Sequence, residues 1–114
     1  MKWYRNLYIG KTFEGKKKRI MRCVRSGKPL KDLYLILLRE DQEHNQLEIM
    51  EQPFLYKILP DTDSVLVVGA ASGMSEARDL LIEMTDEVYH ATGGVLLRDY
   101  ILSRQMGDET QFTS

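Results

Sequence analysis

The segment Ser64-Val-Leu-Val-Val-Gly-Ala-Ala-Ser-Gly73 indicates the fold class more clearly than any other part of the chain. Its four consecutive apolar residues, Val65–Val68, present no polar face, and three of them are β-branched. β-branched side chains favour strands, and an unbroken apolar run is typical of a strand covered on both faces. We therefore predict a buried central strand, followed by a turn of small residues over Gly69–Gly73.

A long amphipathic helix is predicted directly after this turn. Ser75 is the N-cap candidate, Glu76 suits the positively polarised first turn, and Gly93 has the position of a C-terminal glycine. Apolar residues recur at helical spacing and form one stripe: Ala77, Leu80, Leu81, Met84, Val88 and Ala91. The acidic residues fall mostly outside this stripe and form an outer face, together with His90: Glu76, Asp79, Glu83, Asp86 and Glu87.

The remaining patterns alternate between strands and helices. They predict a strand over Trp3–Ile9, a basic helix over Phe13–Ser26, strands over Leu33–Leu38 and Leu47–Met50, a short helix from Pro53 and a short last helix over Val95–Ile101. Polar segments over Arg39–Gln46 and Pro60–Asp63 are predicted as a loop and a turn. The resulting order β-α-β-β-α-β-α-α is typical of a single layered α/β domain with its central strands covered by helices. We assign residues 1–104 to this domain and residues 105–114 to a flexible C-terminal tail.

The charges are strongly divided between the two ends of the chain, although the formal net charge is only -1. Residues 1–31 contain eleven lysines and arginines and a single acid, Glu14, whereas the remaining residues contain five basic residues and sixteen acids. Such asymmetry indicates a polyanion or an oppositely charged protein surface as partner. The alternative is that the two halves face and neutralise each other within one fold.

Cysteine content and hydropathy indicate the cellular compartment in which the protein is expected. Cys23 is the only cysteine, so that no internal disulfide forms and a reducing compartment is favoured. No apolar run approaches the roughly 20 residues that span a bilayer, and the segment Met1–Arg5 lacks the apolar core of a signal peptide. We predict a cytoplasmic protein without membrane contact. His44 and His90 have no cysteine or aspartate at metal-ligand spacing, and we predict neither a metal nor a cofactor.

Two short motifs suggest phosphate binding. Gly10-Lys11-Thr12 resembles the end of a P-loop, but Arg5 stands where a P-loop requires glycine, and a plain turn is the better interpretation. The turn containing Gly69, Ser72 and Gly73 precedes a helix, whose N-terminal amides favour anions. Close packing of helix on strand explains the same small residues without a ligand. The turn is therefore a candidate site for a small ligand, a phosphate or an enzyme substrate, and it ranks below the surface hypotheses.

A resemblance extends over most of the chain to about Tyr100. The opening Trp3-Tyr4-x-Asn6-Leu7-Tyr8-Ile9-Gly10, the turn at Gly69, the pair Glu76-Ala77 and the ending Tyr89-x-x-Thr92-Gly93 resemble a group of small uncharacterised proteins of clostridial gut bacteria. The group has no established activity, so the resemblance implies a bacterial source and no catalytic residue.

These observations predict a protein-interaction module rather than an enzyme, because no catalytic constellation accompanies the divided charge. Another copy of the chain is the favoured partner, with basic face against acidic face or helix against helix. The second hypothesis is nucleic-acid binding through a run of cations on the predicted basic helix: Lys16, Lys17, Lys18, Arg19, Arg22 and Arg25.

Overall fold

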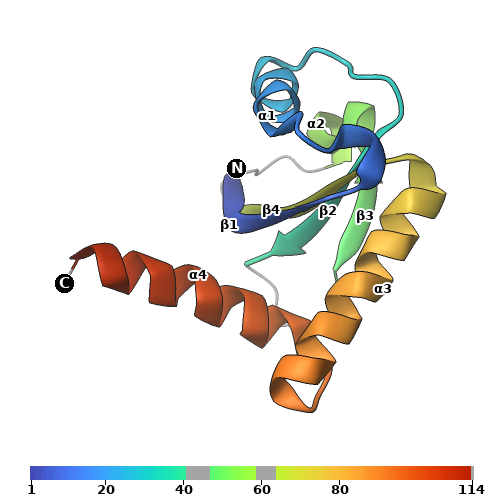
Figure 1. Cartoon of the computed structure of the whole chain (residues 1–114). Coiled ribbons are helices and arrows are strands. Elements are labelled where there is room, and N and C mark those ends of the chain that lie inside the picture. The colour runs from blue at the N-terminus through green and yellow to red at the C-terminus, as the bar shows by residue number, and fades with distance from the viewer. Residues whose placement is uncertain (41–46, 59–63, 114) are drawn as a thin grey trace.

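β4 (Val65–Ser72) lies inside a four-stranded mixed sheet with the strand order β1-β4-β2-β3. The computed structural model describes residues 1–40, 47–58 and 64–113 (Figure 1). β1 (Lys2–Ile9) runs parallel to β4, whereas β2 (Leu33–Arg39) is antiparallel to β4 and to β3 (Glu48–Glu51). β1 and β3 therefore form the two edges of the sheet.

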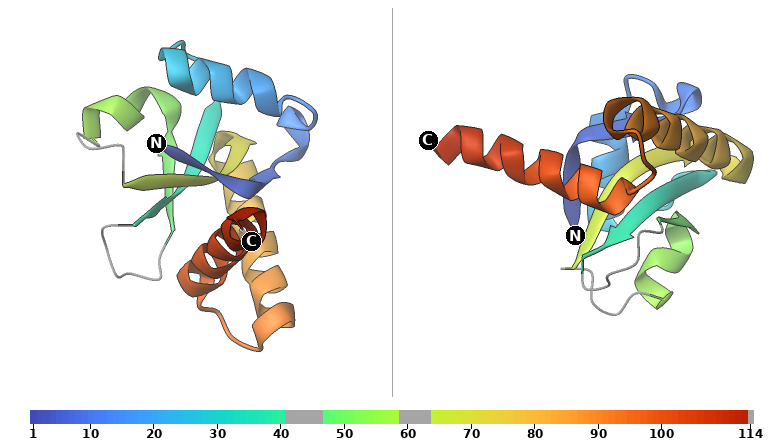
Figure 2. Two further views of the ribbon diagram at one scale, coloured as in Figure 1. Left: turned by 90° about the vertical axis from the view of Figure 1, so that its left-hand side faces the viewer. Right: turned by 90° about the horizontal axis from the view of Figure 1, so that it is seen from below.

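Helices cover both faces of this sheet (Figures 1 and 2). One face packs against α1 (Lys17–Ser26), the 3-10 turn η1 (Lys11–Phe13) and the short α2 (Leu55–Ile58), which follows the 3-10 turn η2 (Gln52–Phe54). The opposite face packs against α3 (Gly73–Thr92) and the start of α4 (Leu97–Thr113). The α/β class and the order of elements predicted from the sequence are confirmed.

The valine-rich segment has the predicted environment. Val65–Val68 are each at most 1% exposed. Val65 and Val67 belong to the core on the α1 side, and Leu66 and Val68 belong to the core on the α3 side. Burial of each such side chain contributes roughly 1.5–3 kcal/mol, so this strand binds the two helical layers together.

The segment after these valines differs from the predicted turn. β4 continues as a strand through Ser72, and Gly69 lies inside it rather than in a turn. Ile36 pairs with Gly69 and Leu37 with Val67, so that β4 contains one extra residue at this point, as in a β-bulge. A Cβ atom at Gly69 would lie 3.0 Å from Cδ1 of Ile36. A side chain at this position would therefore crowd Ile36 on the neighbouring strand, which the sequence does not reveal.

The start of α3 also differs from the prediction. The helix begins at Gly73 with Ser72 as its N-cap, so Ser75 is a residue of the first turn and not the cap. Gly73 has φ +78°, a conformation that strains any residue with a side chain. Ala77, Leu80, Met84 and Val88 are buried as predicted. Leu81 is only partly buried and Ala91 is exposed.

The basic helix is shorter than predicted, because Phe13 lies in η1 and α1 begins at Lys17. Gly15, with φ +79°, separates the two elements. Gly27 ends α1 in the left-handed conformation. The short third strand occupies Glu48–Glu51, one residue later than predicted. The predicted turn over 60–63 and most of the predicted loop over 39–46 lie outside the described residues.

α4 is much longer than the predicted last helix. It begins at Leu97 and its backbone remains helical through Thr113, where an aperiodic tail was expected from Gln105. Leu97 and Ile101 are buried against the sheet. The later part of the helix projects beyond the sheet on the side of β1 (Figures 1 and 2). The flexibility assigned to residues 105–114 stays a prediction.

Candidate functional site

The basic surface consists of six exposed cations on α1 and the residue before it: Lys16, Lys17, Lys18, Arg19, Arg22 and Arg25. Ile20 and Val24 are buried beneath them and hold the helix on the sheet. Within the ranges that the structure describes, none of the six cations forms an ion pair with a carboxylate. The charges are therefore available to a partner.

The cations of this surface destabilise the helix that carries them. Lys16–Arg19 occupy the N-cap and first turn of α1, and no acid lies in that turn. The N-terminus of a helix carries a partial positive charge, so each cation there is unfavourable by about 0.3–1 kcal/mol. Lys18 and Arg22 are also spaced as i and i+4, where like charges repel. Residues that violate a local rule without a compensating contact commonly belong to functional surfaces.

The acidic surface lies on α3, on the opposite side of the sheet. Asp79, Glu83 and Asp86 are exposed along the outer side of this helix. Asp86 lies 3.4 Å from Nδ1 of His90, and the imidazole is suitably placed near the negative end of the helix. The cations of α1 and the acids of α3 therefore do not neutralise each other, since the sheet and its two cores separate the two helices (Figure 2).

Two of the acids predicted for the outer face have partners inside the protein. The Tyr8 hydroxyl donates a hydrogen bond to the Glu87 carboxylate. Glu76 accepts from the backbone N–H of Ser72 and, through its other oxygen, from the backbone N–H and the hydroxyl of Thr12 at 3.0 and 2.9 Å. A Cβ atom at Gly10 would lie 2.7 Å from this carboxyl group, so Gly10 makes room for it.

The same contacts determine the acidity of Glu76. Partial burial raises its pKa, but the hydrogen bonds from Ser72 and from both groups of Thr12 outweigh this effect and hold the pKa below its ordinary value of 4.5. The carboxylate therefore stays ionised at neutral pH, at the positive end of α3. We assign Glu76 to the connection between η1 and α3 and not to the acidic surface.

At the predicted ligand site of Gly69, Ser72 and Gly73, two of the backbone N–H groups that would bind an anion are already used within the protein. The Ser72 amide donates to Glu76, and the Gly73 amide donates to the carbonyl of Asp32 at 2.8 Å. The neighbouring hollow, about 530 Å³ in volume, is lined by carboxylates that would repel a phosphate: Glu14, Glu76, Asp79 and Glu83. Among the described residues, no group of three potential ligands is arranged to hold a metal ion. A ligand at this position stays an untested prediction.

An apolar patch lies near the acidic surface and was not predicted from the sequence. It consists of Ile82 and Tyr89 on α3 and of Val95 after it, which are 52–66% exposed. A shallow hollow of about 460 Å³ runs between Leu81, Tyr89 and Val95. Clustered exposed apolar side chains are typical of protein–protein contacts. The spacing of Ile82 and Tyr89, seven residues apart on one helix, is the sequence signal that points to this patch.

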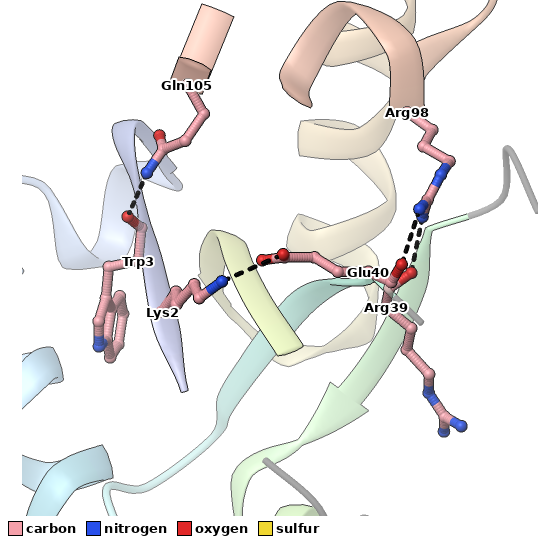
Figure 3. A network of polar contacts seen from close by, with 6 residues as sticks. All are labelled: Lys2, Trp3, Arg39, Glu40, Arg98 and Gln105. Atoms are coloured by element: carbon pink, nitrogen blue, oxygen red, sulfur yellow. Dashed lines mark hydrogen bonds and ion pairs between the residues drawn. The ribbon is translucent and has the colours of Figure 1, made fainter. Parts of the chain in front are cut away.

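Three further polar residues were also missed, and each connects distant elements. Gln52 is buried, where its carboxamide accepts from Leu30 N–H at 2.8 Å and donates to the carbonyl of Lys28 at 2.7 Å. Arg98 of α4 donates to the carbonyls of Arg39 and Glu40 at 2.6 and 2.9 Å, at the end of β2 (Figure 3). Gln105, farther along α4, contacts the backbone of β1. No local sequence signal marks these residues.

The fold and these surfaces define a small three-layered α/β protein whose two outer helices carry opposite charge. No family model, curated protein or solved structure matches the chain. In the described part of the chain, none of the helices combines the length and the apolarity that crossing a bilayer requires.

Proposed function

We propose that the protein is a self-associating interaction module, in which the basic surface of one copy binds the acidic surface of the next. One observation carries this proposal: the two surfaces lie on opposite faces of one sheet, and the cations of α1 have no acidic partner in the described part of their own chain. Opposite charges steer such surfaces together and exclude contacts between like faces.

The arrangement of the surfaces determines the kind of assembly. Because a copy uses two different faces, its contacts are heterologous and lead to rings or open chains rather than to a simple two-fold dimer. The apolar patch on α3 supports a protein as the partner, since Ile82 and Tyr89 add apolar area beside the charges of Asp79, Glu83 and Asp86.

A charge-swap experiment tests this proposal. The first variant reverses two of the six charges of the basic surface (Lys18→Glu with Arg22→Glu), and the second reverses two of the three charges of the acidic surface (Asp79→Lys with Glu83→Lys). In sedimentation velocity at about 20 mM salt, where charges are weakly screened, the wild type should associate and each variant alone should be monomeric. An equimolar mixture should associate again, as pairs, because the unchanged acidic α3 of the first variant complements the unchanged basic α1 of the second.

The control is the same series at about 500 mM salt, where screening should make all samples monomeric. Circular dichroism would confirm that the variants are folded, since all four positions are exposed. A wild type that is monomeric at low salt would contradict the proposal. So would a mixture of the two variants that remains monomeric while the wild type associates.

Nucleic-acid binding is the second candidate function. The observation that favours it is the continuity of the basic surface, whose six cations are all exposed on one helix and its N-terminal neighbour. A surface of this kind neutralises phosphates and releases counterions, so affinity falls steeply with salt. Half-buried Trp3 lies on β1 on the same side of the sheet and offers an aromatic ring.

The same variants separate the two functions. Fluorescence anisotropy with a single-stranded oligonucleotide should show loss of binding for the variant reversed on α1 under either hypothesis. The variant reversed on α3 distinguishes them, because it should lose self-association but bind an oligonucleotide at least as tightly as the wild type. No measurable binding by the wild type at low salt would exclude the second candidate.

A further inference from the structure

The two edges of the sheet are protected to different degrees. β3 has only four residues and bears Glu48 and Glu51 at its two ends, so that it is a poor template for another strand. β1 has eight residues, five of them aromatic or apolar, besides Lys2 and Arg5, and its pairing with β4 is irregular between Trp3 and Tyr8. A long edge strand of this composition tends to pair with another chain unless something covers it.

Gln105 covers part of that edge. Its Oε1 accepts a hydrogen bond from the backbone N–H of Arg5 at 3.1 Å. Its Nε2 donates to the carbonyl of Trp3 at 3.5 Å, the contact that Figure 3 shows. Backbone groups two residues apart point to the same side of a strand. The carboxamide therefore occupies the place that a peptide group of an added strand would take.

α4 brings Gln105 to this position from a distance of 100 residues in the sequence. The helix is anchored by buried Leu97 and Ile101 and by the hydrogen bonds of Arg98 to the end of β2. The later part of the helix projects away from the sheet (Figure 1). Gln105 thus lies at the point where a displacement of α4 would first expose β1.

We propose that the outer edge of β1 is a second interaction surface, which fits β1 of another copy in antiparallel pairing and which Gln105 keeps closed. The two groups that Gln105 binds are self-complementary. In an antiparallel pair centred on Tyr4, Arg5 N–H of each copy donates to the Trp3 carbonyl of the other. This register places Trp3 opposite Arg5, so that the two arginines do not face each other. The product is a closed two-fold dimer with a continuous sheet.

The experiment replaces Gln105 and measures mass at about 500 mM salt, where association through the charged surfaces is screened. Gln105→Asn keeps the carboxamide but shortens its reach by one methylene, and Gln105→Leu removes both hydrogen-bonding groups. Both variants should shift from monomer to dimer in sedimentation equilibrium at concentrations where the wild type is monomeric. Amide exchange of Arg5 should become slower in the variants as the protein concentration rises.

Two matched controls accompany these variants. Gln105→Glu retains the acceptor for Arg5 N–H and should remain closer to the monomer, and Ser103→Ala changes an exposed residue on the same helix and should behave as the wild type. Gln105 is only partly buried, so its replacement by asparagine preserves the fold even where leucine does not. Gln105→Asn that is folded and monomeric at the highest soluble concentration would overturn the proposal.

The result is independent of the association proposed for the charged surfaces. Adding Lys18→Glu and Arg22→Glu to Gln105→Asn should leave the dimer at high salt unchanged. A dimer that appears only at low salt and disappears with these reversals would belong to the charged surfaces and would refute pairing through β1.

Discussion

The two outer helices of this protein bury apolar residues on the same sheet, but they differ in how their terminal charges relate to the helix dipole. α3 has Glu76 in its first turn and His90 in its last, which are the signs that the helix dipole favours. α1 has cations in its first turn and no acid there to balance them. The charges at the ends of α3 therefore match its dipole, whereas those at the start of α1 oppose the dipole of that helix. This difference is the physical reason to look for function on α1.

The two helices also differ in their anchoring, and core truncations test this with the largest expected effect. α1 has two buried residues, Ile20 and Val24, and α3 has four. Ile20→Ala and Met84→Ala should each lower the free energy of unfolding by about 2–5 kcal/mol in urea titrations. Hydrogen exchange should show that Ile20→Ala releases α1 while β4 stays protected, and that Met84→Ala weakens the whole domain. Equal loss of protection in both variants would show that α1 is as firmly integrated as α3.

The next largest effect concerns the N-terminus of α3. Glu76→Ala removes the acceptor of three hydrogen bonds, from Ser72 and from both groups of Thr12. We expect a loss of about 2–3 kcal/mol in the free energy of unfolding, because hydrogen bonds to a charged group are stronger than neutral ones. Thr12→Val should lose only part of this amount, since it retains the backbone donor. A change within error of zero for Glu76→Ala would mean that neither these hydrogen bonds nor the helix dipole makes Glu76 stabilising at the start of α3.

The pH dependence of stability sharpens this assignment. The pKa of Glu76 in the folded protein lies below its ordinary value of 4.5. The stabilisation from this carboxylate is therefore present above about pH 4.5 and is lost as pH falls through the folded pKa. Urea midpoints between pH 6 and pH 3 should fall less steeply for Glu76→Gln than for the wild type. Parallel curves for the two proteins would contradict the depressed pKa.

Sequence patterns predicted the parts of this fold that depend on local periodicity. The run Val65–Val68 and the stripe of Ala77, Leu80, Met84 and Val88 identified the central strand and its covering helix, because burial repeats along each element. The bulge at Gly69 and the close approach of Ile36 could not be predicted, since both depend on the pairing of β4 with another strand.

The same distinction applies to the candidate site. The six cations of the basic surface were found because charge and exposure follow directly from composition and helical spacing. The role of Glu76 was missed because its partner Thr12 is 64 residues away. Gln105 was placed in a tail because no pattern along the chain shows that α4 reaches the backbone of β1. Long-range polar contacts of this kind depend on topology and not on residue type.

The smallest expected effect comes from making the same charge change at each end of α1. This pair of variants tests most directly whether the cations at the start of α1 oppose its dipole. Lys18 lies in the first turn, where a negative charge is favourable, and Arg25 lies in the last turn, where a positive charge is favourable. Lys18→Glu should therefore stabilise the protein by about 0.3–1 kcal/mol, and Arg25→Glu should destabilise it by a similar amount. Both changes remove the same charge from the basic surface, so both should weaken association at low salt.

This pair separates stability from binding because the two properties move independently. Lys18→Glu is expected to give a more stable protein that binds less well, which is the behaviour of a charge retained for function at the expense of the fold. Thermal unfolding at low and at high salt would measure the first property, and sedimentation at low salt the second. If Lys18→Glu lowered stability, the cations of α1 would have a structural role in the folded chain, and the basic surface would lose its claim to be the binding site.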